Sequence, residues 1–169
     1  DALTEDAPMG GLDPYSASKS CAEIAVSAWR ASFFNGPAAP RIATARAGNV
    51  IGGGDWGAHR LLPGVFTAFA AGKTPSLRMP DAVRPWQHVL DALHGYLMLA
   101  EALHGKDGSR FATGWNFGPD AADEISVAEI ANRAAAHWGE GTRIEIAPAN
   151  FQKETRALRL DSSRARTEL

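Results

Sequence analysis

The stretch that decides the fold runs from residue 13 to residue 57 and reads DPYSASKSCAEIAVSAWRASFFNGPAAPRIATARAGNVIGGGDWG. Asp13 can cap a helix and proline is tolerated in a first turn, so the pattern predicts a helix from Pro14 to about Phe34. The next residues alternate and carry β-branched side chains, which predicts a strand over Arg41–Ala47. A glycine-rich loop over Gly48–Gly57 follows.

The rest of the chain continues this alternation. The predicted helices cover Arg60–Ala71, His88–Leu103 and the segment behind the capping-box pattern Ser126-Val-Ala-Glu129. The predicted strands cover Ser76–Arg78, Gly114–Phe117, Arg143–Ile146 and Leu158–Leu160, and a short helix capped by Ser162 or Ser163 closes the chain. The helix His88–Leu103 has one predicted apolar face, formed by Val89, Leu93, Tyr96, Leu97, Ala100 and Leu103. Such alternation indicates an α/β architecture with parallel pairing.

The composition indicates a sizeable hydrophobic core and a chain with little net charge. The 169 residues are 45% hydrophobic and carry 17 Lys+Arg against 19 Asp+Glu, which fits one domain or a piece of a larger one and argues against nucleic acid as a partner. No stretch approaches the roughly 20 apolar residues that cross a bilayer, so no membrane partner is expected. The histidines show no metal-ligand spacing, so no metal site is expected. The single cysteine, Cys21, is expected to fill space in the core, and the absence of a signal-peptide pattern favours the cytoplasm.

The first predicted helix carries the pattern Tyr15-Ser-Ala-Ser-Lys19. Residues four apart lie on the same face of a helix. A positive charge near a phenol favours the phenolate, which makes Tyr15 a candidate proton shuttle for the interconversion of an alcohol and a ketone. The alternative is a partly buried tyrosine with a surface lysine one turn later.

Four short motifs follow one another along the chain: Asp13-Pro-Tyr-Ser-Ala-Ser-Lys19, Ala45-Arg-Ala-Gly-Asn-Val50, Arg84-Pro-Trp-Gln-His-Val-Leu-Asp91 and Gly114-Trp-Asn-Phe-Gly118. Together they resemble the extended short-chain dehydrogenases/reductases that act on nucleotide sugars. The resemblance implies the C-terminal part of a doubly wound, Rossmann-like parallel sheet together with a small substrate-binding lobe. Residues 1–57 would form the last part of the dinucleotide-binding fold, including the helix with Tyr15 and Lys19. Residues 58–169 would mainly form the substrate-binding lobe.

One departure from the family pattern indicates a branch. Most relatives carry Tyr-Gly-Pro after Asn-Val, whereas Ile51-Gly-Gly-Gly54 stands here and is similar to the CDP-sugar branch. The resemblance then implies a nucleotide-sugar 4,6-dehydratase that converts CDP-glucose to CDP-4-keto-6-deoxyglucose with NAD recycled within each cycle. A 4-epimerase or decarboxylase of the same family, and a non-catalytic fragment that binds a sugar nucleotide weakly, remain as alternatives.

The resemblance also implies roles for particular residues. Tyr15 would take the proton of the sugar 4-hydroxyl as hydride leaves C4. Lys19 would bond the nicotinamide ribose, and both Tyr15 and Lys19 would contact the cofactor. Further residues would bind the substrate: Asn49 at the sugar or diphosphate, Arg60 at the nucleotide, Arg78 at the base, Arg84 at the diphosphate, and Asn116 at a phosphate or the nucleotide. The alternative for each is an ordinary structural or surface role. Arg46 is interpreted as a partner in a structural ion pair and is not assigned to the site.

Two pieces of the family pattern are missing from the 169 residues. No Gly-X-Gly-X-X-Gly or Gly-X-X-Gly-X-X-Gly motif opens a helix, and no Thr-Asp pair precedes Tyr15. The chain is therefore expected to correspond to the C-terminal half of a family member, cut at both ends, with the glycine-rich N-terminal half absent. The resemblance implies a homodimer in the complete protein that uses the helix Tyr15–Phe34.

Overall fold

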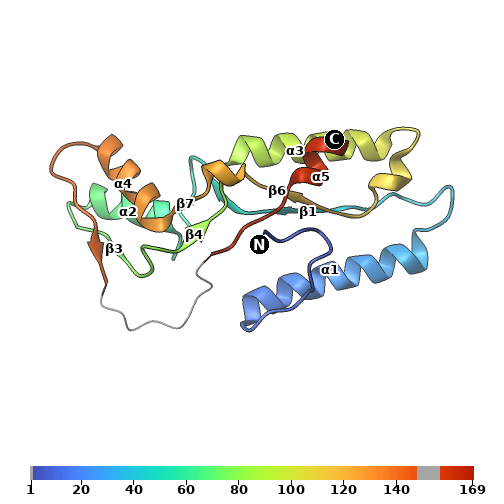
Figure 1. Ribbon diagram of the computed structural model, residues 1–169, viewed down its shortest axis with the longest axis horizontal. Coiled ribbons are helices and arrows are strands. Elements are labelled where there is room, and N and C mark those ends of the chain that lie inside the picture. The colour runs from blue at the N-terminus through green and yellow to red at the C-terminus, as the bar shows by residue number, and fades with distance from the viewer. Residues whose placement is uncertain (1, 148–156) are drawn as a thin grey trace. The chain divides into compact units, whose positions relative to one another are not determined.

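The computed structural model describes residues 2–147 and 157–169, which form the predicted α/β architecture (Figure 1). The helices are α1 (Pro14–Phe33), α2 (Leu61–Ala70), α3 (Val89–His104), α4 (Val127–Trp138) and α5 (Ser163–Glu168). The strands are β1 (Thr44–Ala47), β2 (Asn49–Ile51), β3 (Ser76–Leu77), β4 (Val83–Arg84), β5 (Trp86–His88), β6 (Gly114–Phe117), β7 (Ile125–Ser126) and β8 (Glu145–Ile146). Within the described ranges, no helix is long and apolar enough to cross a membrane.

The chain divides into two compact units. Unit 1 consists of Asp1–Ala47, Leu90–Gly118 and Leu160–Leu169. Unit 2 consists of Gly48–Val89 and Pro119–Arg159. Unit 1 joins β1 to α3 and β6, which lie far from β1 in the sequence.

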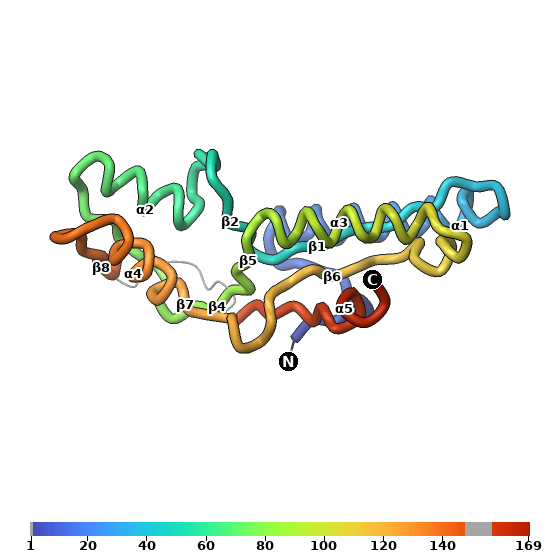
Figure 2. Tube along the Cα trace, turned by 90° about the horizontal axis from the view of Figure 1, so that it is seen from above, coloured from blue at the N-terminus to red at the C-terminus, as the bar shows by residue number. Residues whose placement is uncertain are grey.

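Unit 1 is built on the parallel pair of β1 and β6, in which residues 44–47 lie opposite residues 114–117. Figure 1 shows α3 along one face of this pair and α1 along the other, and in Figure 2 α1 lies behind α3. Successive residues of a strand point to opposite faces, so the pair has an apolar and a polar face. Trp115 and Phe117 join the core of unit 1, whereas Arg46 bonds to α1.

The helix α3 packs on the apolar face through two small residues and one leucine. Its buried residues are Ala92, Gly95 and Leu99. The apolar face predicted for this helix is therefore partly wrong, since Leu97 is 70% exposed and Leu93 is exposed as well. Small side chains permit a close approach of helix to sheet, and the spacing of large apolar residues does not reveal it.

We expect Gly95→Ala to destabilise unit 1. A Cβ at this position would overlap Cδ1 of the buried Phe117 ring, so the ring must shift, at a cost of about 1–3 kcal/mol. Gly64→Ala in α2 is the matched control, because a Cβ there meets nothing within 4 Å and the change should stabilise the helix by up to about 1 kcal/mol. Denaturant unfolding of both variants checks the pair, and an unchanged midpoint for Gly95→Ala would contradict the close packing.

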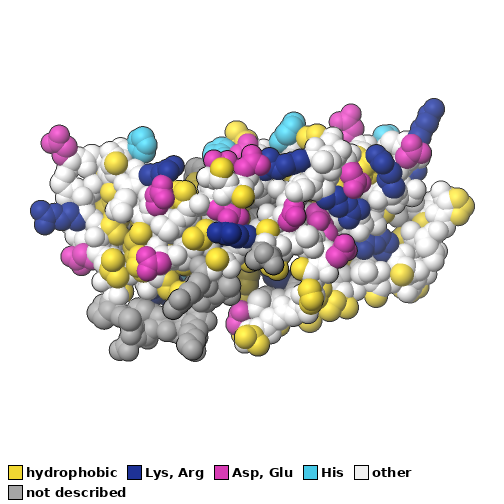
Figure 3. Space-filling model, viewed as in Figure 1, with side chains coloured by type: hydrophobic (Ala, Val, Ile, Leu, Met, Phe, Trp, Pro, Cys, Tyr) yellow, Lys and Arg dark blue, Asp and Glu magenta, His cyan; other side chains and the backbone are white. Residues whose placement is uncertain are grey.

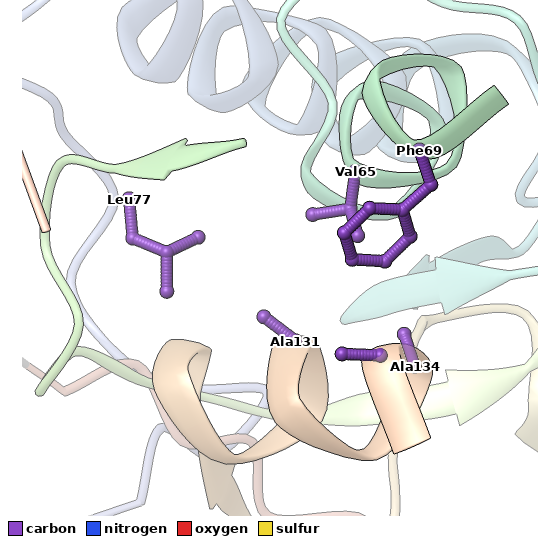
Figure 4. Close-up of a cluster of buried hydrophobic side chains, with 6 residues drawn as sticks. Val65, Phe69, Leu77, Ala131 and Ala134 are labelled. Atoms are coloured by element: carbon purple, nitrogen blue, oxygen red, sulfur yellow. The ribbon is translucent and has the colours of Figure 1, made fainter. Parts of the chain in front are cut away.

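The core of unit 2 lies between two helices (Figure 4). Val65 and Phe69 of α2 face Ala131 and Ala134 of α4, and Leu77 of β3 belongs to the same cluster. The alanines leave room for the phenylalanine ring, so unit 2 has a hydrophobic core of its own.

Short strand pairs complete unit 2. β2 pairs with β5 and β3 with β8 in parallel, whereas β4 and β7 are antiparallel. β2 lies within the predicted loop Gly48–Gly57, and β4 and β5 were not predicted either. None of these three strands is longer than three residues, which is too short to show a period of two.

Other predictions are confirmed or corrected at the ends of elements. Ser126 Oγ accepts a hydrogen bond from the backbone N–H of Glu129 at 3.1 Å, which confirms the predicted cap of α4. The predicted strand Arg41–Ala47 is shorter than expected and begins at Thr44. The predicted strand Leu158–Leu160 is wrong, because only isolated bridges are formed there.

Two further expectations concern single residues. The final helix is not capped by a serine side chain, because Asp161 Oδ1 accepts from the backbone N–H of Ser163 at 2.9 Å. Cys21 does not fill the core, because it is exposed. Within the described part of the chain, α1 contains no buried residue, so any single position on it is a poor candidate for the core.

Candidate functional site

The first turn of α1 is fixed by its cap. Asp13 Oδ1 accepts hydrogen bonds from the backbone N–H groups of Tyr15 at 2.9 Å and Ser16 at 3.0 Å. The hydroxyl of Ser16 and these N–H groups hold the pKa of Asp13 below its usual value of 3.8. The predicted cap is confirmed, and it fixes the backbone of Tyr15 directly.

The predicted Tyr15–Lys19 pair is brought together on the surface of unit 1. Lys19 Nζ lies 5.5 Å from the centre of the Tyr15 ring. The tyrosine is 72% exposed, and the lysine is exposed too. An accessible phenol next to an ammonium group can exchange a proton with a bound ligand.

We expect Asp13→Ala to fray the turn that carries Tyr15, because the N–H groups of Tyr15 and Ser16 lose their acceptor. Amide hydrogen exchange at these two residues should become faster. Asp13→Asn is the control, since it keeps an acceptor.

The pKa of Asp13 is lowered in the folded chain, so the contribution of Asp13 to stability is complete above pH 3.8 and is lost as the pH falls through the lowered value. The asparagine variant should lack this pH dependence, and unchanged exchange in Asp13→Ala would contradict the role of the cap.

Two of the predicted substrate contacts lie in neighbouring segments of unit 2. The backbone N–H of Asn49, on β2, donates to the carbonyl of Pro85 at 3.0 Å. Pro85 directly follows Arg84, whose Nη1 donates to the carbonyl of Val83 at 2.9 Å. The backbone bond between Asn49 and Pro85 therefore brings together the two segments that carry these predicted contacts.

The other two predicted cations of unit 2 lie at its surface. Arg60 precedes α2 as its N-cap residue, and its Nε lies 3.5 Å from Asp55 Oδ2. The side chain of Arg60 is 63% exposed and that of Asp55 is 35% exposed, so this ion pair contributes little to stability. Arg78 follows β3 directly and is exposed.

Asn116 differs from the other predicted contacts because its side chain is buried. It is 1% exposed, and its Nδ2 donates to the carbonyls of Leu3 at 3.0 Å and Asp161 at 3.3 Å. Both amide hydrogens thus hold segments from the two ends of the chain against β6. This arrangement favours the structural alternative for Asn116 over a phosphate contact.

A sheltered ion pair joins α1 to β1. Arg46 Nη2 donates to Glu23 Oε2 at 2.8 Å, which confirms the structural ion pair predicted for Arg46. Burial alone would raise the pKa of Glu23, but bonds from Arg46 and Thr44 and the charges of Arg46 and Arg30 hold that pKa below its usual value. Sequence reasoning missed Glu23, although its place one helical turn after Lys19 is a signal that could have found it.

The predicted site residues fall into two groups. Tyr15, Lys19 and Asn116 belong to unit 1, and the asparagine and arginines predicted to bind the substrate, Asn49, Arg60, Arg78 and Arg84, belong to unit 2. In the part of the chain that the structure describes, no group of three or more His, Cys, Asp or Glu side chains is arranged to hold a metal ion.

Comparison with known proteins decides the family. Residues 1–114 match the model of the NAD dependent epimerase/dehydratase family. The chain belongs to this family. The resemblance inferred from the four motifs is therefore confirmed at the level of the family.

The relatives within the family include sugar-nucleotide dehydratases and epimerases. The CDP-glucose 4,6-dehydratase of Salmonella typhimurium is 44% identical over 170 residues, which cover 98% of this chain and 47% of that protein. The dTDP-glucose 4,6-dehydratase of Streptomyces venezuelae, solved with NAD, has a TM-score of 0.79 at 20% identity over 100% of this chain and 48% of its own. The UDP-glucuronic acid 4-epimerase of Bacillus cereus, solved with UDP-glucuronic acid and NAD, has a TM-score of 0.80 at 18% identity over 99% and 49%. The chain spans about half the length of these relatives, and the two structures confirm its fold.

Proposed function

We propose that this chain supplies proton-transfer and substrate-binding residues of a nucleotide-sugar 4,6-dehydratase that acts on CDP-glucose. The observation that carries the proposal is the 44% identity to a CDP-glucose 4,6-dehydratase over 98% of the chain. The exposed Tyr15–Lys19 pair supports it, because oxidation of a sugar hydroxyl needs a base beside the bound sugar.

In this proposal Tyr15 Oη accepts the proton of the sugar 4-hydroxyl, and Lys19 donates a hydrogen bond to the nicotinamide ribose. When bound, NAD supplies a hydride acceptor that is regenerated within the cycle. The exposed ammonium of Lys19, 5.5 Å from the Tyr15 ring, fits the ribose end of that cofactor. A glycine-rich turn for the pyrophosphate is missing from the 169 residues, so we assign only the ribose end to this chain.

The substrate would be held by the donors of unit 2. We assign the diphosphate to Arg84 and Asn49, whose segments adjoin through Pro85. Arg60 and Arg78 remain candidates for the nucleotide, as surface cations. We do not retain Asn116 among the contacts, because its amide hydrogens are already bonded in the interior.

The proposal includes a homodimer and a cytoplasmic location. Hydrophobic side chains lie at the surface along α1 (Figure 3), and Ile24, Trp29 and Phe33 are all exposed. A second copy could cover this helix. The cytoplasm is proposed because NAD and nucleotide sugars are available there.

A hybrid enzyme tests the proposed function. The segment of the Salmonella enzyme that aligns with this chain would be replaced by the chain, and the purified hybrid would be incubated with CDP-glucose. Formation of the 4-keto-6-deoxy product, at a rate approaching that of the parent, would support the proposal. A folded hybrid that binds NAD yet forms no product would contradict it.

The same assay separates the alternatives. A 4-epimerase would return CDP-galactose from CDP-glucose without loss of water, and a decarboxylase would act on a CDP-uronic acid instead. A non-catalytic chain would give no product from any of these compounds. UDP-glucose and dTDP-glucose serve as controls for the base of the nucleotide.

By itself, the 169-residue chain is expected neither to bind NAD tightly nor to convert CDP-glucose. It lacks the glycine-rich motif whose backbone N–H groups hold the pyrophosphate, and it lacks the Thr-Asp pair before Tyr15. Calorimetric titration with NAD checks the first point, and a product assay checks the second. Micromolar affinity for NAD, or turnover by the chain alone, would contradict the prediction.

A further inference from the structure

The ion pair of Glu23 and Arg46 has no role in the function proposed above, and it is sheltered from solvent. The side chains of Arg46 and Glu23 are 23% and 19% exposed, and Thr44 Oγ1 donates to the same Glu23 oxygen at 2.7 Å. The pair Glu129–Arg133 on α4 is by contrast largely exposed. Salt screens a sheltered pair less, and breaking it leaves a poorly solvated charge.

Arg46 is also held from directions other than α1. Its Nη1 donates to the carbonyl of Glu5 at 3.1 Å, and the carboxylate of Glu5 accepts from the backbone N–H of Asn116 at 2.9 Å. A Cβ at Gly114 would lie only 2.5 Å from Arg46 Nη2. Any larger residue at this position would therefore collide with the guanidinium group. These contacts hold the guanidinium group of Arg46 in one position against the β1–β6 pair.

The helix α1 depends on such polar anchors. No residue of α1 is buried among the described residues, so apolar packing fixes its rotation weakly. A second anchor comes from Arg30, whose Nη1 donates to the carbonyl of Ile42 at 3.1 Å. Residues seven apart on a helix lie within about 20° of one line, so Glu23 and Arg30 hold the same side of α1 against the strand segment.

We propose that Glu23 is a positioning residue, which sets the rotation of α1 about its axis and thereby the direction of Tyr15 and Lys19. At 100° per residue, Lys19 lies about 40° and Tyr15 about 80° around the helix from Glu23. A rotation of α1 would therefore carry both side chains away from a ligand held by the rest of the protein. The catalytic importance of this orientation rests on the proposed function. The orientation of Tyr15 and Lys19 can nevertheless be measured without any assay of that function.

The test uses the 169-residue chain and needs no cofactor or turnover. A nitroxide attached to Cys21, which is exposed on α1, broadens the NMR signals of nearby backbone amides and thus reports how the helix faces β1. Glu23→Gln removes the charge at nearly constant volume. Glu129→Gln, in the exposed pair on α4, is the matched control. Unlabelled samples give amide exchange rates along α1.

We expect Glu23→Gln to change the pattern of broadening over residues 44–47 and to shift the signals of Tyr15 and Lys19. Amide exchange in α1 should become roughly tenfold faster, as for a lost bond to a charged group. Glu129→Gln should leave all of these signals in place. A Glu23→Gln variant with a lower melting temperature but an unchanged pattern of broadening would overturn the proposal, because Glu23 would then stabilise the fold without orienting the helix.

If Glu23→Gln fails to fold, a second variant tests the proposal. Glu23→Gln combined with Arg46→Met removes both charges, so no unpaired charge remains in the sheltered site. A folded double variant with displaced Tyr15 and Lys19 signals supports the proposal. Native signals in the double variant, or its failure to fold, would overturn it. These outcomes are independent of the hybrid assay, in which the proposed function can fail while Glu23 still orients α1.

Discussion

Replacing Tyr15 by phenylalanine in the hybrid enzyme is expected to lower the turnover of CDP-glucose about 100-fold or more, the usual effect of removing a positioned general base. Affinity for CDP-glucose should remain nearly unchanged, because the lost hydroxyl transfers a proton and contributes little to binding the diphosphate. The first turn of α1 should also stay intact, since its cap bonds to backbone N–H groups and not to the phenol. Steady-state kinetics and calorimetric titration together check the split between rate and binding.

The chain offers a matched control for this substitution. It contains two tyrosines, and the second, Tyr96, packs against Phe117 with ring centroids 5.4 Å apart. Tyr96→Phe removes the same hydroxyl from a residue without an assigned catalytic role, so turnover should be close to that of the unmodified hybrid. Near-normal turnover of the Tyr15→Phe enzyme would remove Tyr15 from the proposed mechanism. Parallel losses of rate and affinity would make it a binding residue.

Arg84→Ala is expected to weaken binding of CDP-glucose to the hybrid by about 1.5–3 kcal/mol, or roughly 10- to 150-fold in affinity, which is typical of a lost bond to a charged group. Arg84→Lys should recover only part of the affinity, because an ammonium group lacks the two-pronged geometry of the guanidinium. NAD affinity should change little, since the proposed cofactor contacts of this chain are on α1. Calorimetric titrations with CDP-glucose and with NAD measure both quantities.

Arg133→Ala is the control for Arg84→Ala, because it removes an arginine of unit 2 that lies in an exposed ion pair on α4. It should leave the affinity for CDP-glucose unchanged. If Arg84 serves the fold alone, Arg84→Ala will lower the thermal midpoint and leave CDP-glucose affinity unaltered. That result would remove Arg84 from the candidate site.

Local signals made part of this structure predictable from sequence. Asp13 before Pro14 predicted the start of α1, and Ser126 three residues before Glu129 predicted the start of α4; both caps are formed. Capping depends on a few neighbouring residues, so it can be inferred without knowing the rest of the fold. The pairing of Tyr15 with Lys19 was predictable for the same reason, since it follows from the geometry of one helix.

Features that depend on packing between distant segments were not predictable in this way. The buried side of α3 uses Ala92 and Gly95, whereas the sequence favoured the larger leucines now at the surface. The burial of Asn116 depends on Leu3 and Asp161, which are distant in sequence. Among the candidate site residues, motif spacing could select amino acids but could not tell an exposed side chain from one already bonded in the interior.

The two units alternate along the chain, and this limits how the gene segments that encode them can be exchanged by recombination. The chain passes from one unit to the other after Ala47, Val89, Gly118 and Arg159. A single recombination event joins one parental sequence on its left to another on its right, so both units of the product would usually mix residues from the two parents. Transfer of unit 2 alone would need all of these junctions at once. Variation in the unit that carries Arg84 should therefore arise by point substitution more easily than by exchange of a module.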